Sequence, residues 1–497
     1  MTDYDVIIVG SGFSGIAMAR SLLKQRQRSF VVLEKAEQVG GTWRDNHYPG
    51  CACDVPSHLY SFSFALNPDW SRMFAPQPEI LAYLERCADE LRVREHIRFG
   101  AEVQRVELDE AARVWHVHVA GGRVLTARSV VLGVGAFDKP IVPTLPGLER
   151  FSGEAFHSAR WPSSFNAAGK RLAVIGTGAS AIQFVPQVAK QAARVHLFQR
   201  TPPWVMPKPD FEFSPAQRRR FRERPWLMKA LRSAIYWWME TRGLGFTVSP
   251  KVMKLAALGG KEHIKKQIRD PELRARVTPD YMPGCKRILI ANDYYPTLER
   301  ANVELVSDGV ERVTERSVVT RDGTERDVDA ILFGTGFGVT DILTPLVVVG
   351  RRRRELNEVW AGGIEAHLGT TISGFPNLFI LFGPNTGLGH NSMVFMIESQ
   401  VRYVMNCLQT IEARGARQAD VRAQAQARFN AALAPRLARS VWAAGCQSWY
   451  LDERGRNPTI WPGFTFEYWW KTRRMNPADY ELDTNWLESA SGLGARS

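Results

Sequence analysis

Hydrophobic and polar positions repeat one arrangement twice along the chain, at residues 6–34 and again at residues 171–198. Each stretch consists of a continuous apolar run, a glycine-containing loop, an amphipathic segment and a second apolar run. Continuous apolar runs are typical of parallel strands that are buried on both faces, and amphipathic segments predict helices. The sequence therefore predicts two strand–helix–strand units, which indicate an α/β fold.

The pattern between and after these units predicts further elements. Residues 78–91 have the period of an amphipathic helix, and alternating runs from 97 to 132 predict a β-meander. From 211 to about 276 the pattern is helical and basic, which we interpret as an insert in the second nucleotide domain. A long helix is expected at 395–414.

The loop of the first unit has the spacing of a dinucleotide-binding site. Gly10, Gly12 and Gly15 permit a tight turn, close approach of the backbone to a pyrophosphate, and close packing of the helix. Glu34 ends the second strand at the distance expected for an acid that binds ribose hydroxyls. A strand before the loop and a helix after it make this signal specific.

The loop of the second unit differs in an informative way. Gly176 and Gly178 keep the pattern, and Ala181 is an accepted variant of the third glycine. Arg200 stands where Glu34 stands in the first unit, 24 residues after the first glycine. A guanidinium with the neighbouring Thr201 hydroxyl binds a 2′-phosphate that an acid would repel. We therefore expect NADPH here, with a solvent-facing Arg200 as the alternative.

Composition narrows the class of protein. The 497 residues suffice for two or three domains, and 23% charged residues is ordinary for a globular protein. Six cysteines are too scattered for a disulfide framework, and neither zinc spacing nor a redox Cys-x-x-Cys follows the first loop. We expect reduced, mostly buried thiols and no metal. A strand at the very N-terminus and the absence of a bilayer-length apolar run predict a cytoplasmic protein.

The net charge of +13 raises the question of a nucleic-acid partner. Arginine runs at 218–224 and 351–354 lack a nucleic-acid module or interleaved stacking aromatics. We expect both runs to be solvated, the first in the helical insert and the second in a turn after Gly350. The positive field then helps to collect anionic dinucleotides, and no nucleic-acid partner is expected.

The segment between the two units carries the most specific pattern. Phe151, Gly153, His157, Trp161 and Pro162 read Phe-x-Gly-x-x-x-His-x-x-x-Trp-Pro. This pattern resembles the fingerprint of Baeyer–Villiger monooxygenases, flavoproteins that use FAD and NADPH to insert oxygen beside a ketone carbonyl. For the segment taken alone, the alternative is a linker with a core Phe, a turn Gly and a satisfied His.

Other stretches resemble the same family. The loop at 40–60 is similar to its Gly-Gly-Thr-Trp…Tyr-Pro-Gly…Asp motif, which lines the flavin and places an aspartate, here Asp54, near the ring. Without the flanking match, Asp54 reads as a turn or N-cap acid. Residues 374–393 resemble the last flavin strand and its loop.

Two further matches concern the nicotinamide cofactor. Lys286-Arg287 resembles the family's Lys-Arg pair, in which Lys meets the 2′-phosphate and Arg faces the flavin. Trp449 matches a family tryptophan that contacts the cofactor. The chain departs from the family at Gly334, which replaces an alanine in the hinge, and at 451–464, which replaces a glycine-rich substrate loop.

The resemblance implies a role for each residue. Arg287 and Asp54 are expected to be catalytic, with Arg287 favouring an anionic flavin C4a-peroxide and Asp54 orienting Arg287. Phe151, Gly153, His157 and Trp161 are expected to couple the domains without acid–base chemistry. The expected FAD-binding residues are Gly10, Gly12, Phe13, Ser14, Gly15, Glu34, Gly41, Thr42, Trp43, Asp54, Tyr60, Val103 and Met393. The expected NADP-binding residues are Gly176, Thr177, Gly178, Ser180, Ala181, Arg200, Thr201, Lys286, Arg287 and Trp449.

The resemblance also predicts the architecture, two Rossmann-like domains of the glutathione-reductase-like type. The FAD-binding domain is expected to comprise residues 1–139 and 336–497, the second part including a substrate-side tail. The NADPH-binding domain is expected at 140–335, with its helical insert at about 207–285. The expected partners are a small ketone and O₂, in a monomer or weak homo-oligomer.

Three other functions stay open on the sequence alone. The first is a related monooxygenase that oxidises amines or sulfides, and the second is a flavin reductase or oxidase without oxygen transfer. The third is a non-catalytic NADPH-binding regulator. The tail at 464–474 contains two tryptophans and three cations that can touch a membrane surface, but packing against the flavin domain is the favoured interpretation.

Overall fold

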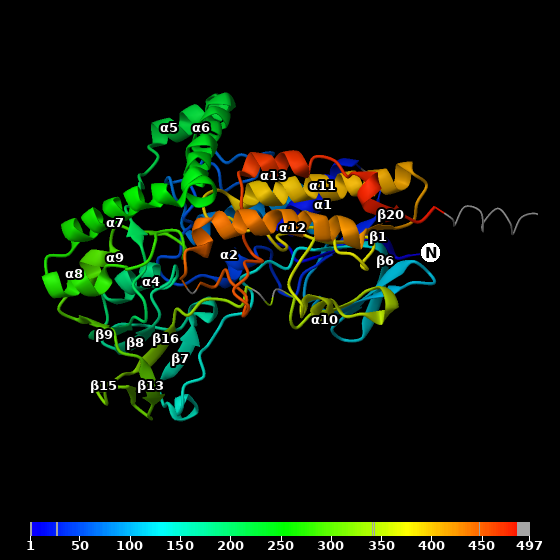
Figure 1. Cartoon of the computed structure of the whole chain (residues 1–497). Helices are drawn as coiled ribbons and strands as arrows, with labels where there is room; N and C mark the ends of the chain where they lie inside the picture. Colours follow the sequence, from blue (N-terminus) through cyan, green and yellow to red (C-terminus); the bar gives the residue numbers. More distant parts are fainter. Residues whose placement is uncertain (1, 26–27, 340, 342, 447, 485–497) are drawn as a thin grey trace, which may run out of the picture.

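Two β-sheets form the framework of the protein (Figure 1). The computed structural model describes residues 2–25, 28–339, 341, 343–446 and 448–484. The first sheet has the order β17-β4-β5-β6-β1-β2-β3, with β18 beside β6. Its strands are β1 (Tyr4–Val9), β2 (Phe30–Leu33), β3 (Ile97–Arg98), β4 (Val103–Asp109), β5 (Val114–Val119), β6 (Arg123–Leu132), β17 (Val347–Val349) and β18 (Leu378–Ile380).

This sheet combines parallel and antiparallel pairing. β1 lies parallel to β2 and β6, whereas β4, β5 and β6 form an antiparallel meander. The meander was expected to begin at 97, but β3 at 97–98 pairs in parallel with β2. α1 (Phe13–Gln25) follows β1 directly, and α11 (Met393–Ala413) packs against α1. Further helices of this half are α2 (Thr42–Asp45), α3 (Gln77–Glu90), α10 (Leu356–Trp360), α12 (Ala423–Arg439) and α13 (Thr465–Lys471), and β19 (Ala419–Val421) pairs with β20 (Tyr480–Leu482).

The second sheet is entirely parallel, in the order β12-β9-β8-β16-β7. Its strands are β7 (Glu154–His157), β8 (Arg171–Ile175), β9 (Arg194–Phe198), β12 (Val303–Val306) and β16 (Ala330–Phe333). α4 (Ala181–Val188) and α9 (Tyr294–Leu298) contact each other beside it. Smaller sheets pair β10 (Val205–Met206) with β11 (Leu289–Ile290), and β13 (Val310–Val313) with β14 (Ser317–Thr320) and β15 (Glu325–Asp327).

The basic helical stretch is an insert of four helices between β10 and β11. They are α5 (Pro215–Glu223), α6 (Pro225–Gly243), α7 (Met253–Gln267) and α8 (Pro271–Val277). Ser214 begins α5 by accepting the Gln217 backbone N–H, while the Gln217 side chain accepts the Ser214 N–H. α5 and α6 project from the body of the molecule (Figure 1).

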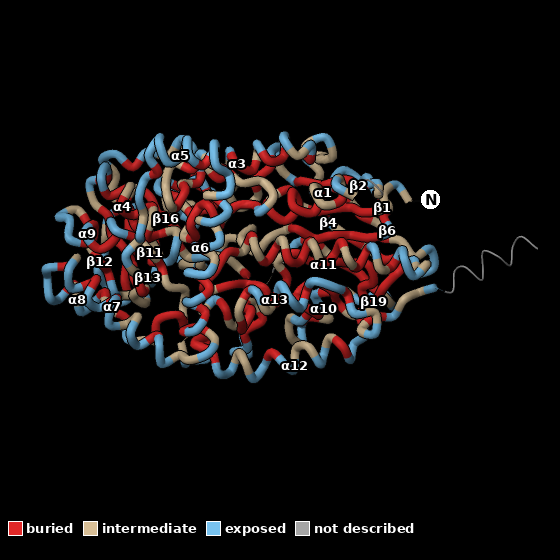
Figure 2. Tube along the Cα trace, turned by 90° about the horizontal axis from the view of Figure 1, so that it is seen from above, coloured by how far each residue is buried: buried red, intermediate tan, exposed pale blue. Residues whose placement is uncertain are grey.

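Buried residues run along the inner strands of the two main sheets (Figure 2). β2 and β16 are buried at every residue, as continuous apolar strands should be. The α/β fold class and the expected helices and strands are therefore confirmed. Among the described residues, no helix is long and apolar enough to cross a membrane.

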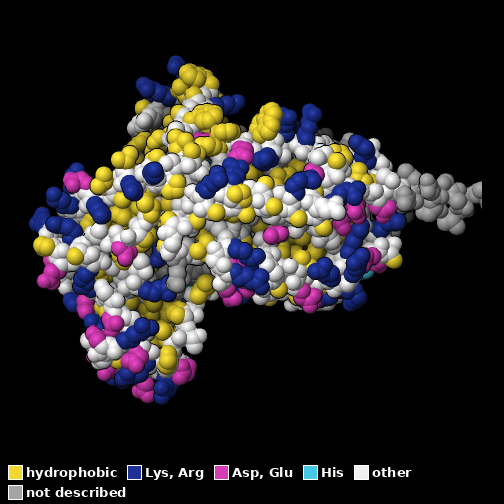
Figure 3. Space-filling view, viewed as in Figure 1, with side chains coloured by type: hydrophobic (Ala, Val, Ile, Leu, Met, Phe, Trp, Pro, Cys, Tyr) yellow, Lys and Arg dark blue, Asp and Glu magenta, His cyan; other side chains and the backbone are white. Residues whose placement is uncertain are grey.

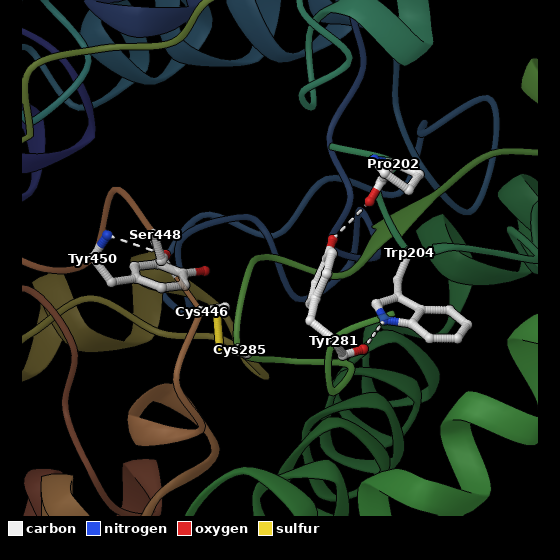
Figure 4. The surroundings of a disulfide bond; sticks show 7 residues. All are labelled: Pro202, Trp204, Tyr281, Cys285, Cys446, Ser448 and Tyr450. Carbon is white, nitrogen blue, oxygen red and sulfur yellow. Dashed lines mark hydrogen bonds between the residues drawn. A yellow bond between two sulfur atoms is a disulfide. The ribbon is translucent and has the colours of Figure 1, made fainter. Parts of the chain in front are cut away.

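The expectation of six reduced thiols is wrong at two positions, because Cys285 and Cys446 form a disulfide (Figure 4). The two residues are 161 positions apart in sequence, so their spacing gave no signal, yet the fold brings their Cα atoms to 6.1 Å. That separation is ordinary for a disulfide. Cys51, Cys53, Cys87 and Cys407 are free and buried, as expected.

The disulfide ties the insert to the C-terminal tail, and its loss should reduce stability. Closing so long a loop restricts the unfolded chain and contributes about 2–4 kcal/mol. We expect Cys285→Ser/Cys446→Ser to unfold at a lower temperature than the oxidised wild type in calorimetry. Dithiothreitol should lower the wild-type midpoint and leave the double variant unchanged. Equal midpoints for oxidised wild type and variant would contradict this role.

Candidate cofactor and active site

The first nucleotide loop brings two backbone segments face to face. A Cβ at Gly15 would lie 1.9 Å from the Gly10 carbonyl oxygen, so protein packing alone requires glycine there. A Cβ at Gly12 would instead meet nothing closer than the Gly41 Cα, at 3.8 Å. The fold tolerates a methyl group at Gly12, and a bare backbone at this place suits a bound pyrophosphate. The loop therefore fits FAD.

Glu34 directly follows β2 and is buried, held by groups of its own half. The Ser11 hydroxyl donates to one carboxylate oxygen at 2.7 Å, and Arg44 donates to the other at 2.9 Å. The backbone N–H groups of Ser11 and Ala36 donate as well. These bonds orient the carboxylate beside the loop, where it can also accept a ribose hydroxyl.

The other expected FAD residues lie on several elements of the same half of the molecule. Phe13 packs edge-on against Tyr60 at 5.2 Å, and the Trp43 indole N–H donates to the Tyr60 hydroxyl at 3.2 Å. Ser14 is buried in α1, and Thr42 begins α2. Val103 begins β4 in a core cluster shared with Leu33, and Met393 begins α11.

The loop at 40–60, called the flavin loop below, contacts the second half of the molecule directly. The Tyr48 hydroxyl donates to the Gln183 side chain at 3.0 Å, and Gln183 donates in turn to the Ala52 carbonyl at 3.0 Å. Gln183 belongs to α4, the helix that follows the second nucleotide loop. Sequence reasoning missed this residue, because an internal helical glutamine has no motif of its own.

The fingerprint segment lies at the same junction. β7 pairs with β16 at the edge of the second sheet, and Trp161 is buried against Phe156 and Phe184. The Trp161 carbonyl oxygen lies 2.9 Å from Nε2 of His47 in the flavin loop. A side chain at Gly153 would collide with the Asp329 carbonyl at 2.4 Å, which explains this glycine by packing.

The other two fingerprint residues are structural in their contacts. Phe151 packs in the core cluster beside β13 and β14. Burial lowers the pKa of His157 to about 4, and its Nδ1 accepts the Ala159 N–H at 3.1 Å. The His157 ring stands edge-on to Phe337 at 5.4 Å, where the chain leaves β16. The imidazole of His157 is therefore neutral at pH 7 and hydrogen-bonded through Nδ1, and its lack of an acid–base role stays a prediction.

Asp54 and Arg287 form an ion pair between the two halves. Nε of Arg287 donates to Asp54 Oδ2 at 3.0 Å, and Nη2 donates to the same oxygen. The charge of Asp54 raises the pKa of Arg287 above its ordinary value, so the guanidinium stays protonated. About 30% of each side chain is exposed, with 29% for Asp54 and 31% for Arg287. Asp54 is therefore not a turn or N-cap acid, and Arg287 keeps an accessible face.

Aromatic residues of the tail lie beside this pair. Arg287 counteracts the rise in pKa that burial causes at Tyr450, which places the phenol near the guanidinium. Trp449 stacks obliquely on Tyr450 at 4.1 Å and is 41% exposed. Phe137 stands edge-on to Trp449 at 6.4 Å. Tyr450 and Phe137 were not predicted as site residues.

Two cations from separate segments, Arg200 after β9 and Lys286 before β11, lie close together. Lys286 precedes β11, which pairs with β10 just after Arg200 and Thr201, so the small sheet brings these segments together. Burial and the nearby Arg200 charge lower the pKa of Lys286, and its Nζ lies 5.0 Å from the Tyr281 ring centre. Arg200 is exposed. Two neighbouring cations of this kind suit a phosphate ligand.

The rest of the second loop parallels the first. A Cβ at Gly178 would meet only the Gly334 carbonyl oxygen, at 3.7 Å, whereas one at Gly176 would lie 2.5 Å from it. The Thr177 hydroxyl donates to the Thr201 carbonyl at 3.3 Å, and Ser180 precedes α4, which starts at Ala181. The middle glycine is again the one that protein packing does not require.

The divergent tail forms the wall of a cavity of about 590 Å³. Leu433, Leu437 and Trp442 line it, together with loop 451–458. Asn385 holds that loop by donating to the Asn457 carbonyl at 2.9 Å and to the Ile460 carbonyl at 3.0 Å. Neither Asp54 nor Arg287 lines the cavity, so it is separate from the ion pair.

Comparison with known proteins decides the family. A family model described as pyridine nucleotide-disulphide oxidoreductase matches residues 7–234. A Baeyer–Villiger monooxygenase of Pseudomonas aeruginosa is 51% identical over 98% of this chain and 93% of that protein. The chain belongs to the Baeyer–Villiger monooxygenase family.

Solved structures agree with this assignment. An oxidised steroid monooxygenase bound to NADP matches with a TM-score of 0.86 and 32% identity, over 97% of this chain and 99% of that one. A complex of OTEMO with FAD and NADP matches with a TM-score of 0.87 and 28% identity over the same shares. The family resemblance drawn from the motifs is thus confirmed, as is the flavoprotein monooxygenase class. No redox cysteine pair of the kind found in disulfide reductases follows the first nucleotide loop.

The contrasting roles of Gly12 and Gly15 can be tested with one methyl group each. Gly15→Ala should lower the melting temperature of the apoprotein, because overpacking typically costs about 1–3 kcal/mol. Gly12→Ala should melt like the wild type but bind FAD more weakly in a fluorescence titration. A normal FAD affinity for Gly12→Ala would remove that glycine from the pyrophosphate site.

Proposed function

We propose that this monooxygenase converts ketones to esters or lactones with NADPH and O₂, through the Asp54–Arg287 pair. When bound, FAD accepts hydride from NADPH and activates dioxygen, which is the cofactor's own chemistry. The observation that carries the proposal is the accessible, permanently charged guanidinium of Arg287. Asp54, from the loop at 40–60, holds it by two hydrogen bonds.

Arg287 would act electrostatically. Oxygen insertion beside a carbonyl passes through a tetrahedral adduct that carries negative charge. A fixed guanidinium stabilises such charge, and most strongly where water is partly excluded. Asp54 would act as a positioning residue, because Arg287 donates two hydrogen bonds to its carboxylate. The raised pKa of Arg287 argues against a role as proton donor.

The second loop would hold NADPH. Its middle glycine leaves room for a pyrophosphate, and Arg200 with Lys286 would pair with the 2′-phosphate. Trp449, exposed at the junction, would lie against the nicotinamide half. The fingerprint would couple the domains through the contact of Trp161 with His47.

The remaining expectations belong to this proposal as well. The FAD domain would comprise 1–139 and 336–497, and the NADPH domain 140–335 with the insert at 207–285. The enzyme would act in the cytoplasm, where NADPH is regenerated, as a monomer or weak homo-oligomer. Its substrates would be small ketones.

Product analysis tests the function directly. Purified yellow enzyme should oxidise NADPH faster when a suitable ketone from a panel is added, and the product should gain one oxygen atom by mass. Amine and thioether panels run in parallel. A rate increase with amines or thioethers but with no ketone would overturn the proposal.

Removing the guanidinium should separate flavin reduction from oxygen transfer. Arg287→Ala is expected to lower the rate of ester formation about 10²–10³-fold, the usual cost of one such electrostatic contact. The FAD content should stay within twofold of wild type, so that loss of fold is distinguishable from loss of chemistry. Undiminished ester formation by Arg287→Ala would remove this residue from the mechanism.

The phosphate-binding role of Arg200 predicts a change in cofactor preference. Arg200→Ala should raise KM for NADPH by about tenfold or more and leave KM for NADH nearly unchanged, since only NADPH carries the 2′-phosphate. Arg316→Ala, an exposed arginine on the β13–β15 hairpin, is the matched control. An unchanged ratio of the two KM values would exclude Arg200 from the site.

A further inference from the structure

Six large aromatic side chains are exposed on one side of the protein, and the proposed reaction uses none of them. We call them the aromatic patch: Trp226, Trp237 and Trp238 of α6, and Phe466, Trp469 and Trp470 of α13. Trp226 is 62% exposed and Trp470 58%. Single exposed apolar residues are ordinary, but a contiguous group marks an interaction site. The favoured interpretation of the tail is confirmed in that α13 packs against α11 and buries Tyr468, but Trp469 and Trp470 of the same helix remain 41% and 58% exposed.

The two helices present one continuous surface. The rings of Trp237 and Phe466 are 6.2 Å apart, and the Tyr236 hydroxyl lies 3.0 Å from that of Thr465. Buried Glu240 fixes the base of α6 by accepting hydrogen bonds from Asn391 and from Thr465. Figure 3 shows hydrophobic side chains over α6 and α13, with Lys and Arg side chains around them. The patch is therefore a fixed part of the folded protein.

Basic residues surround the patch. Residues 215–243 contain eight Lys or Arg and two acids, one of which is the buried Glu240. Arg220, Arg224 and Lys229 are exposed, and within the described part of the chain no ion pair involves them. At α13 the exposed Lys471, Arg473 and Arg474 continue the positive charge (residues near the end of the described chain).

Several arginines lie over the tryptophan rings themselves. The guanidinium carbon of Arg473 is 3.5 Å from the Trp470 ring centre, and that of Arg242 is 4.2 Å from the Trp238 ring centre. Trp469 has Arg402 at 4.4 Å. Such pairs keep apolar and cationic groups at the same depth. Tryptophan and Arg/Lys are the residues that favour the headgroup layer of a bilayer.

A second copy of the chain fits this surface poorly. A two-fold dimer brings the same patch of each subunit together, so the cations would face their own copies. The cores of protein interfaces are moreover depleted of charge. An anionic bilayer supplies both missing partners, negative headgroups for the cations and an apolar layer for the indoles.

We propose that the aromatic patch docks the enzyme on the surface of an anionic membrane. α6 and α13 lie at the interface, their tryptophans enter the headgroup layer, and the surrounding cations pair with anionic lipid. The attachment is peripheral and reversible. It is independent of the reaction, since neither the ion pair nor the nucleotide loops belong to the patch.

Vesicle flotation of the FAD-loaded enzyme tests this docking. Vesicles of phosphatidylglycerol mixed with phosphatidylcholine should carry the enzyme upward at low salt, and high salt should weaken binding. Vesicles of phosphatidylcholine alone should bind it at least tenfold less. Trp226→Ser/Trp237→Ser/Trp470→Ser should reduce the partition coefficient on anionic vesicles by about tenfold or more.

A charge variant with a matched control completes the test. Arg220→Gln/Arg224→Gln/Lys229→Gln should weaken binding by about fivefold per cation removed. Arg312→Gln/Arg316→Gln/Arg321→Gln removes the same charge from the β13–β15 hairpin, on the side away from α6 (Figure 1), and should bind like the wild type. All variants should keep the wild-type FAD content and melting temperature.

Three results would overturn the proposal. One is no flotation with anionic vesicles at low salt. Another is equal losses for the patch and hairpin charge variants, which would indicate a response to net charge alone. The third is self-association of the wild type in light scattering that the tryptophan variant abolishes, together with unchanged vesicle binding, since the patch would then serve a second copy of the chain.

Discussion

The ion pair between Asp54 and Arg287 joins segments that are 233 residues apart in sequence and belong to different halves of the molecule. About 30% of each side chain is exposed, so loss of one partner leaves the other charge unpaired at a smaller cost than in a fully buried pair. Asp54 lies in the loop at 40–60 and Arg287 just before β11, so the pair forms only when both segments are folded.

The two halves are held in register by a small number of specific contacts. Gln183 reaches the flavin loop from the second nucleotide helix, and His47 reaches back to the Trp161 carbonyl. The disulfide between Cys285 and Cys446 ties the segment that contains Lys286 to the tail that contains Trp449. The fingerprint contributes a backbone carbonyl and buried aromatic packing to this junction, and burial lowers the pKa of His157 at the edge of the second sheet. These contacts hold the two halves of the molecule against each other.

The elements were predictable wherever periodicity and loop chemistry agree. β8 and β9 were expected at their observed bounds, because apolar runs bordered by glycine or charge leave little choice. The pairing of Asp54 with Arg287 was expected only from the family resemblance. The two residues are 233 positions apart, and such a separation in sequence does not indicate that they are close in space. Three features had no such signal. The disulfide joins cysteines that are 161 positions apart. Gln183 belongs to no recognisable motif. The exposure of Trp469 and Trp470 depends on which face of α13 packs against the rest of the protein.

Asp54 is proposed to act by positioning Arg287, and a double-mutant cycle measures how far the effect of Asp54 depends on Arg287. kcat/KM for ester formation would be compared among the wild type, Asp54→Asn, Arg287→Ala and the double variant. We expect a coupling energy of about 1–3 kcal/mol, because Asp54→Asn should lower kcat/KM only while Arg287 is present. Equal losses from Asp54→Asn in both backgrounds would contradict it, because Asp54 would then act on its own.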